Sequence, residues 1–237
     1  MSPRYFALLA ALSLTGCIDA STFASHNVET KFHRAIPAAG ATQVTVINVS
    51  GSITVIASDR PNVDVSALIY GADQGAVNRT HVVTQGGSSI TVKTEYDNTG
   101  TGGVFGNTNG AQVDYTIRVP KTIAVSVTNI SGPTTLTGLG GNVDASEISG
   151  RLDATLGSLT GTRSVKMNAI SGRITVRIAR DSSARVNAST LSGSVNLFFP
   201  SDLHQGVVGN SATGRIGKGA SSMTLHTVSG PIAVEPE

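Results

Sequence analysis

A short motif recurs along this chain: a branched aliphatic residue, Ser, Gly, any residue and then, in most copies, an apolar residue. The full copies contain the glycines Gly51, Gly132, Gly150, Gly172, Gly193 and Gly230, and a degenerate copy, Ala212 to Ile216, contains Gly214. From Gly132 to Gly230 these glycines are spaced 18, 22, 21, 21 and 16 residues apart. A repeat of about 20 residues has the length of one coil of a β-solenoid.

The segments between the glycines have the alternation of β-strands. Val125–Ile130 and Ile174–Ile178 alternate apolar and polar residues, which directs aliphatic side chains inward and Ser, Thr and Arg outward. Each Ser-Gly pair is then expected at a corner, where Gly accepts an unusual φ and Ser bonds a freed backbone group. Weaker second corners are expected at 139–141 and 159–161. We therefore predict an all-β solenoid in which each coil stacks in parallel on the coil before it.

The composition agrees with this prediction. Only 4% of the residues are aromatic, there is no Trp, and Gly occurs 27 times. Charged residues make up 14% and hydrophobic residues 39%, a balance that excludes ordinary disorder. Glu, Lys and Leu are too scarce for a helical bundle. A coil of about 20 residues encloses a thin core, which small aliphatic side chains fill.

The N-terminal part before residue 121 is less regular. Strands are expected at Phe32–Pro37, Val44–Ile56, Val63–Tyr70, Ile90–Tyr96 and Val113–Val119. The segment Asp97–Gly110 is rich in Gly and Asn and predicts a flexible loop. The sequence divides into 1–16 as a signal peptide, 17–30 as a tether and 31–237 as one solenoid domain.

The only cysteine, Cys17, follows a segment typical of a secretory signal. Arg4 precedes an apolar run, Tyr5–Leu14, which is too short to span a bilayer as a helix. The sequence that ends at Cys17, Leu-Thr-Gly-Cys, resembles the lipobox of bacterial lipoproteins. This resemblance implies cleavage before Cys17, lipidation of its thiol and a membrane anchor in the cell envelope. In a Gram-negative cell, Ile18 would favour the outer membrane. The alternative is a plain secretory signal that is cut further on, for example after Ala24.

The order of motifs resembles the bacterial DUF4097 family, whose members carry the labels adhesin and β-strand repeat protein. The resemblance covers residues 31–235 and rests on the first Ser-Gly coil, an irregular strand pair, the stretch Asp114–Pro120 and the later Ile-Ser-Gly coils. It implies a right-handed parallel β-helix or β-roll on an envelope protein. It implies no catalytic site and no cofactor. In this chain Ser, Pro or Arg replaces the acidic residue that usually follows Ser-Gly in the family.

Few residues form a pattern typical of a chemical site. The five histidines, His26, His33, His81, His204 and His226, have no metal-ligand spacing. The glycine-rich segment 100–106 lacks the third glycine of a dinucleotide loop, since Phe105 stands there, and no helix is expected after it. We expect no catalytic residue, cofactor or metal. A formal charge of +2 does not indicate a nucleic-acid partner.

One basic feature carries a binding hypothesis. Arg151, Arg173 and Arg215 each follow a glycine of the repeat, so stacked coils would align them in a column. Such a face would bind an anionic glycan, lipid phosphates or another envelope polymer. The alternative is a solvated face that keeps the protein soluble.

The function that these observations favour is a non-enzymatic, envelope-anchored lipoprotein that acts as an adhesin-like interaction module. One alternative is a structural or stress-response component of the envelope without a dedicated ligand. A polysaccharide lyase or hydrolase is a third hypothesis, because such enzymes often have β-helical folds and place paired carboxylates in one groove. The sequence does not determine the oligomeric state.

Overall fold

The computed structural model describes residues 28–97, 110–199 and 210–237. Cys17, the signal and most of the tether lie outside these residues, as do His26, His204 and positions 98–109 of the expected loop. The strands are β1 (Val28–Pro37), β2 (Gln43–Ser50), β3 (Ile53–Ser58), β4 (Asn62–Gly71), β5 (Thr80–Gln85), β6 (Ser89–Tyr96), β7 (Gln112–Pro120), β8 (Ala124–Ser131), β9 (Thr134–Thr137), β10 (Val143–Thr155), β11 (Ser164–Ile178), β12 (Ala184–Ser192), β13 (Val195–Leu197), β14 (Ser211–Ile216), β15 (Ser221–Ser229) and β16 (Ile232–Pro236). The short helix α1 (Gln74–Asn78) is the one helix among them.

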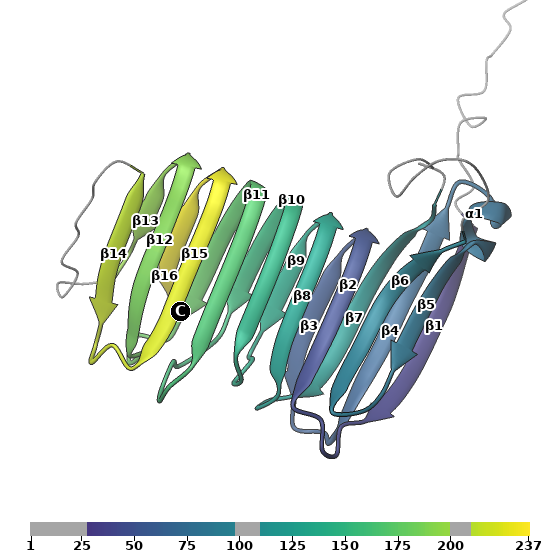
Figure 1. Ribbon diagram of the computed structural model, residues 1–237, viewed down its shortest axis with the longest axis horizontal. Coiled ribbons are helices and arrows are strands. Elements are labelled where there is room, and N and C mark those ends of the chain that lie inside the picture. Colours follow the sequence, from purple (N-terminus) through teal and green to yellow (C-terminus); the bar gives the residue numbers. More distant parts are fainter. Residues whose placement is uncertain (1–27, 98–109, 200–209) are drawn as a thin grey trace, which may run out of the picture.

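The strands pair into two layers that face each other (Figure 1). The first layer has the order β5-β6-β2-β8-β10-β11-β15-β12-β14. The second has the order β1-β4-β7-β3-β9-β10-β11-β16-β13. β10 and β11 belong to both layers because each continues through a corner. The result is a flattened, elongated solenoid (Figure 1).

The Ser-Gly motifs form the corner that joins the two layers. In adjacent strands Ser50 pairs with Ser131, Ser131 with Ser149, and Ser149 with Ser171. Ser171 then pairs with Ser229, and Ser229 with Ser192. All six full copies of the motif therefore lie in a single register along one edge of the solenoid, as the repeat predicts.

Close packing between neighbouring coils explains the glycine in this motif. A Cβ added at Gly172 would overlap the carbonyl oxygen of Gly150, and one at Gly150 would overlap that of Gly132. Neither Gly150 nor Gly172 has a positive φ, unlike Gly132 with φ 125°. Every corner therefore requires glycine because the backbone of the adjacent strand comes too close for a Cβ, which the sequence did not indicate. An unusual φ is required only at some corners.

Aliphatic side chains fill the space between the layers. One inward column runs through all six corner coils and is at most 1% exposed: Val46, Val127, Ala145, Met167, Leu225 and Ala188. The exposed fraction of Tyr115, the largest fully buried residue, is also 1%. The inward aliphatic side chains confirm the predicted alternation, and the small residues in the column fit a thin core.

The all-β prediction is confirmed, but the sheet is mixed, so a purely parallel β-helix is not. The corner coils pair in parallel. The pairs β1–β4, β4–β7 and β5–β6 at one end and β12–β14 at the other are antiparallel. The short connection between β5 and β6 permits only an antiparallel pair, since a parallel crossover needs a longer segment.

The predicted order of coils is also wrong at the C-terminal end. β11 pairs with β15 and not with β12, so the last coil of the sequence lies between the two coils that precede it. The degenerate copy at Gly214 forms no corner. It lies within β14, which runs antiparallel to β12 and closes this end of the first layer.

The five irregular strands expected before residue 121 are present, with Val44–Ile56 divided at the corner into β2 and β3. β5 and α1 were not expected. α1 begins where the Asp73 carboxylate accepts a hydrogen bond from the backbone N–H of Ala76. β1 begins at Val28, inside the segment expected to be tether.

Candidate interaction surfaces

Arg151 and Arg173 lie side by side on the outside of the solenoid. They are Cα partners in the parallel ladder of β10 and β11, and both are exposed. In the coils on either side, Thr134 pairs with Leu152 and Ile232 pairs with Ile174. The positions equivalent to the two arginines in these coils are therefore prolines, Pro133 and Pro231. The predicted arginine column therefore exists, but it is two residues long.

The third predicted member, Arg215, is not in this column. It lies in β14 and is the antiparallel partner of Arg185 in β12. Because Gly214 is not a corner glycine, the residue after it is placed on the first layer. The prediction of a three-arginine column is therefore wrong at Arg215.

Ion pairs offset part of the positive charge near Arg151 and Arg173. The Nε of Arg151 lies 2.7 Å from an oxygen of Asp153, and Arg177 lies 3.2 Å from Glu235. No ion pair of Arg173 is found in the described part of the chain. Arg173 is thus the cation of this face best placed to meet an external anion.

Arg163, in the turn between β10 and β11, has a structural role. Its guanidinium donates hydrogen bonds to the carbonyls of Leu139 at 2.7 Å and Gly141 at 3.0 Å. Burial lowers the pKa of Arg163. These bonds join the segment just after the second corner 159–161 to the corner 139–141 of the preceding coil. They leave this arginine unsuited to an external ligand.

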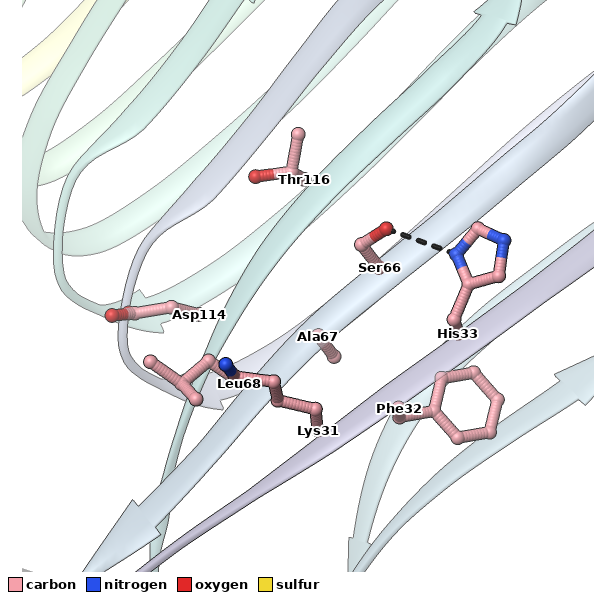
Figure 2. A pocket seen from close by; sticks show the side chains of 8 residues that line it. All are labelled: Lys31, Phe32, His33, Ser66, Ala67, Leu68, Asp114 and Thr116. Atoms are coloured by element: carbon pink, nitrogen blue, oxygen red, sulfur yellow. Dashed lines mark hydrogen bonds between the residues drawn. The ribbon is translucent and has the colours of Figure 1, made fainter.

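A shallow recess of about 440 Å³ lies on the outer surface of β1, β4 and β7 (Figure 2). Its rim carries Lys31 and His33 from β1, and its floor includes Ser66 and Leu68 from β4. The Nδ1 of His33 and the hydroxyl of Ser66 are 3.1 Å apart (Figure 2). The recess therefore offers one ammonium, one imidazole and apolar surface.

Asp114 closes one side of this recess. Its Oδ1 accepts hydrogen bonds from the backbone N–H and the hydroxyl of Ser52, at 2.7 and 2.8 Å. The pKa of Tyr70 is raised, first by burial and then by Asp114. Asp114 is thus engaged in holding the first corner. Sequence reasoning missed the recess because its residues come from strands that are far apart in the chain and are joined by antiparallel pairing.

The described histidines do not gather. His33 contacts Ser66, His81 lies 3.0 Å from Asp97, and His226 lies 3.0 Å from Ser189. Within residues 28–97, 110–199 and 210–237 no group of three His, Cys, Asp or Glu side chains is placed to hold a metal ion.

A buried polar column lies just inside the Ser-Gly corner, at the position three residues before each glycine. Its members, in spatial order, are Asn48, Asn129, Glu147, Ala169, Thr227 and Thr190, all less than 9% exposed. Asn129 donates to the carbonyls of Gly51 and Gly132, both at 3.1 Å. The Thr190 hydroxyl donates to the carbonyl of Gly230 at 3.1 Å. The column thus satisfies carbonyls that the bend leaves without partners.

Glu147 is the one acid of this column and is 3% exposed. Its Oε2 accepts a 2.7 Å hydrogen bond from the hydroxyl of Thr134. Burial raises the pKa of Glu147 to about 7, and the hydrogen bond from Thr134 opposes part of this rise. Sequence reasoning missed this column. A pattern in the sequence nevertheless indicates it, because the inward-facing position three residues before the corner glycine is polar at five of the six corners.

No helix in the described part of the chain has the length and apolarity needed to cross a membrane. Cys17, the predicted lipidation site, lies outside the described residues, so its anchoring role stays a prediction.

With this geometry in place, the chain can be compared with known proteins. Residues 122–235 match the model of the family Toastrack DUF4097. This segment contains five of the six Ser-Gly corners, so the match supports the family that the motif order resembles. A search of the curated proteins found no match.

The fold also occurs in a solved structure. A candidate cell adhesion protein from Clostridium sporogenes ATCC 15579 superposes with a TM-score of 0.64 over 89% of this chain and 100% of that chain, at 12% identity. A candidate adhesin from Bacteroides fragilis NCTC 9343 matches over 86% of this chain and 97% of that chain, with 14% identity and a TM-score of 0.33. Of these two, the first superposes closely enough to show a common fold.

Proposed function

We propose that this chain is a non-enzymatic lipoprotein of the cell envelope, anchored to a membrane through Cys17, and that its solenoid is an adhesin-like interaction module. The observation that carries the proposal is the common register of the six Ser-Gly corners. This register stacks the coils into one rigid body whose outward side chains form fixed columns. Rigid surfaces of this kind bind partners without a large cost in ordering entropy.

Two further observations support the proposal. Residues 122–235 match the Toastrack DUF4097 model, and a protein named as a candidate for cell adhesion has the same fold. The lipobox-like sequence at Cys17 supports the anchor.

Metabolic labelling with palmitate tests the anchor. We expect label in the wild-type protein and none in Cys17→Ala, because the thiol is the site of acylation. Equal labelling of both proteins would contradict the proposal. Recovery of intact Cys17→Ala in the soluble fraction, and not in membranes or aggregates, would show that the variant still folds.

For the ligand, we propose an anionic envelope polymer or glycan at Arg151 and Arg173. Retention on an immobilised anionic polysaccharide should fall steeply with salt. The double variant Arg151→Ala/Arg173→Ala should elute at lower salt than wild type. Arg185→Ala/Arg215→Ala, which also removes two exposed arginines but from the other layer, is the matched control and should elute close to wild type.

A structural or stress-response role without a dedicated ligand is the second candidate. The ion pairs Arg151–Asp153 and Arg177–Glu235 favour it, because they reduce the charge that the basic face presents. Salt-insensitive retention, or identical elution of the two double variants, would support this role over ligand binding.

A further inference from the structure

The residue that precedes each Ser-Gly pair forms an outward-facing line of aliphatic side chains. In spatial order this apolar ridge consists of Val49, Ile130, Ile148, Ile170, Val228 and Leu191. Ile170 is 52% exposed and Leu191, at the end of the line, is 74% exposed. Single exposed aliphatic residues are normal on protein surfaces, but here all of the line except the half-buried Ile130 is exposed, which points to an interaction site.

The ridge follows directly from the polar column inside the corner. Ala169 and the polar residues equivalent to it face inward, so the next residue of each strand faces outward. With neighbouring coils about 4.8 Å apart, the six side chains span about 24 Å. The ridge is therefore an apolar strip one side chain wide along the whole corner edge.

The chain enters the solenoid at this same edge. Thr30 pairs with Ile69, and Ile69 pairs with Val113. The carbonyl of Val113 in turn accepts a hydrogen bond from Asn48, beside the first corner. In Figure 1, β1 begins at the upper edge, where β2, β8, β15 and β12 end.

The distance along the chain from Cys17 to Val28 is short. Eleven residues, fully extended, reach about 40 Å at most. Since the tether joins the solenoid at the ridge edge, a lipid anchor at Cys17 would hold that edge close to the bilayer.

Positive charge lies beside the ridge. Arg151 and Arg173 are three residues beyond Ile148 and Ile170, across the corner, and both are exposed. An aliphatic strip flanked by guanidinium groups suits the boundary between acyl chains and lipid phosphates. A second copy of the chain fits less well, because a standard protein interface buries about 800 Å² on each partner and the ridge is only one side chain wide.

We propose that the apolar ridge docks on the lipid surface that holds the Cys17 acyl chains, with Arg151 and Arg173 against lipid phosphates. The solenoid then lies along the membrane on its corner edge and directs its opposite edge outward. This inference rests on the proposed lipidation of Cys17. It assigns Arg151 and Arg173 to lipid phosphates, as the alternative to the polymer or glycan proposed above.

Depth-dependent fluorescence quenching tests the inference on the full-length lipidated protein in vesicles of phosphatidylethanolamine and phosphatidylglycerol. Ile170→Cys places a thiol on the ridge, and Thr160→Cys places a matched exposed thiol in the turn between β10 and β11, at the opposite edge. Each variant carries an environment-sensitive dye, and spin-labelled lipids serve as the quencher. A lipidated Cys17 does not react with the dye, so wild type is the blank.

We expect quenching at position 170 that is several-fold stronger than at position 160. Adding Arg151→Ala and Arg173→Ala to Ile170→Cys should weaken the quenching, and vesicles of phosphatidylcholine alone should weaken it as well. Equal quenching at both positions would overturn the inference. Contact between dyes on two copies at position 170, without lipid quenching, would also overturn it in favour of a dimer.

The test separates this inference from the proposed function. If wild type takes up the dye and its mass lacks acyl chains, the lipoprotein proposal fails and the docking inference fails with it. If wild type is acylated and bound to vesicles but position 170 is not quenched, only the docking inference fails.

Discussion

Glu147 is a carboxyl group enclosed in the polar column of the corner. Its Oε1 and the Oδ1 of the neighbouring Asn129 are both buried and have no hydrogen-bond partner among the described residues. A proton on Glu147 would satisfy both oxygens at once, since the two residues are Cα partners in adjacent strands. The raised pKa of Glu147, about 7, agrees with a protonated side chain.

This pKa predicts that the folded protein loses stability as pH rises. Above the ordinary value of 4.5 the unfolded chain releases the Glu147 proton while the folded chain keeps it until about pH 7. The free energy of unfolding should therefore fall between these values, by up to about 3 kcal/mol. Glu147→Gln should remove this part of the pH dependence and be more stable than wild type at about pH 8.

Urea unfolding of both proteins at about pH 4 and about pH 8 measures this difference. Glu29→Gln, at an exposed position of β1, is the control and should follow wild type at both pH values. A Glu147→Gln protein that shows the wild-type pH dependence would contradict the assignment of a buried, protonated acid.

Substitution of Gly172 tests the close approach between coils alone, because Gly172 does not have a positive φ. Gly172→Ala should lower the free energy of unfolding by about 3 kcal/mol, because the new Cβ meets the backbone carbonyl of Gly150. Gly86→Ala is the matched control, since its Cβ would lie 3.5 Å from Ile36 in ordinary contact. Thermal unfolding that is unchanged in Gly172→Ala would show that the coils are further apart than described.

At the level of elements, the position of β15 between β11 and β12 distinguishes the structure from a simple solenoid. A sequential solenoid would place Asn168 of β11 next to Ser189 of β12. In the structure Asn168 pairs with His226 of β15, and His226 pairs with Ser189.

Disulfide formation in a Cys17→Ser background measures this order. The pair Asn168→Cys/His226→Cys should oxidise readily, because neighbouring strands are about 4.8 Å apart and within the range of a disulfide. Asn168→Cys/Ser189→Cys should stay reduced, because two strand spacings exceed about 7 Å. The reverse result on a non-reducing gel would contradict the strand order.

The elements also show how far the sequence determines the fold. The repeat predicts the six corners, because each needs Gly at a fixed place and each coil carries the same signal. It does not predict that β15 lies between β11 and β12, because the Ser-Gly register of each coil would fit that of any other coil. It misplaces Gly214 as well, because a local Gly-Arg-Ile pattern in β14 resembles a corner while its pairing with β12 is antiparallel.

For the whole molecule, the sequence predicts the stacked strands and corners better than it predicts which side chains meet on the surface. Arg151 and Arg173 were placed correctly because they lie in the repeat, and Arg215 was not. The recess on β1, β4 and β7 depends on long-range antiparallel pairing, which no local pattern encodes. The apolar ridge was visible in the repeat, but its exposure depends on the inward polar column beside it.

Protease treatment of intact cells tests the central claim most directly, that an anchored solenoid faces outward as an adhesin-like module. Wild type should be cleaved on intact cells as it is after lysis, while a cytoplasmic marker stays whole. Cys17→Ala should disappear from the cell-bound fraction. Protection of the membrane-bound wild-type protein until the cells are lysed would contradict an adhesin-like role.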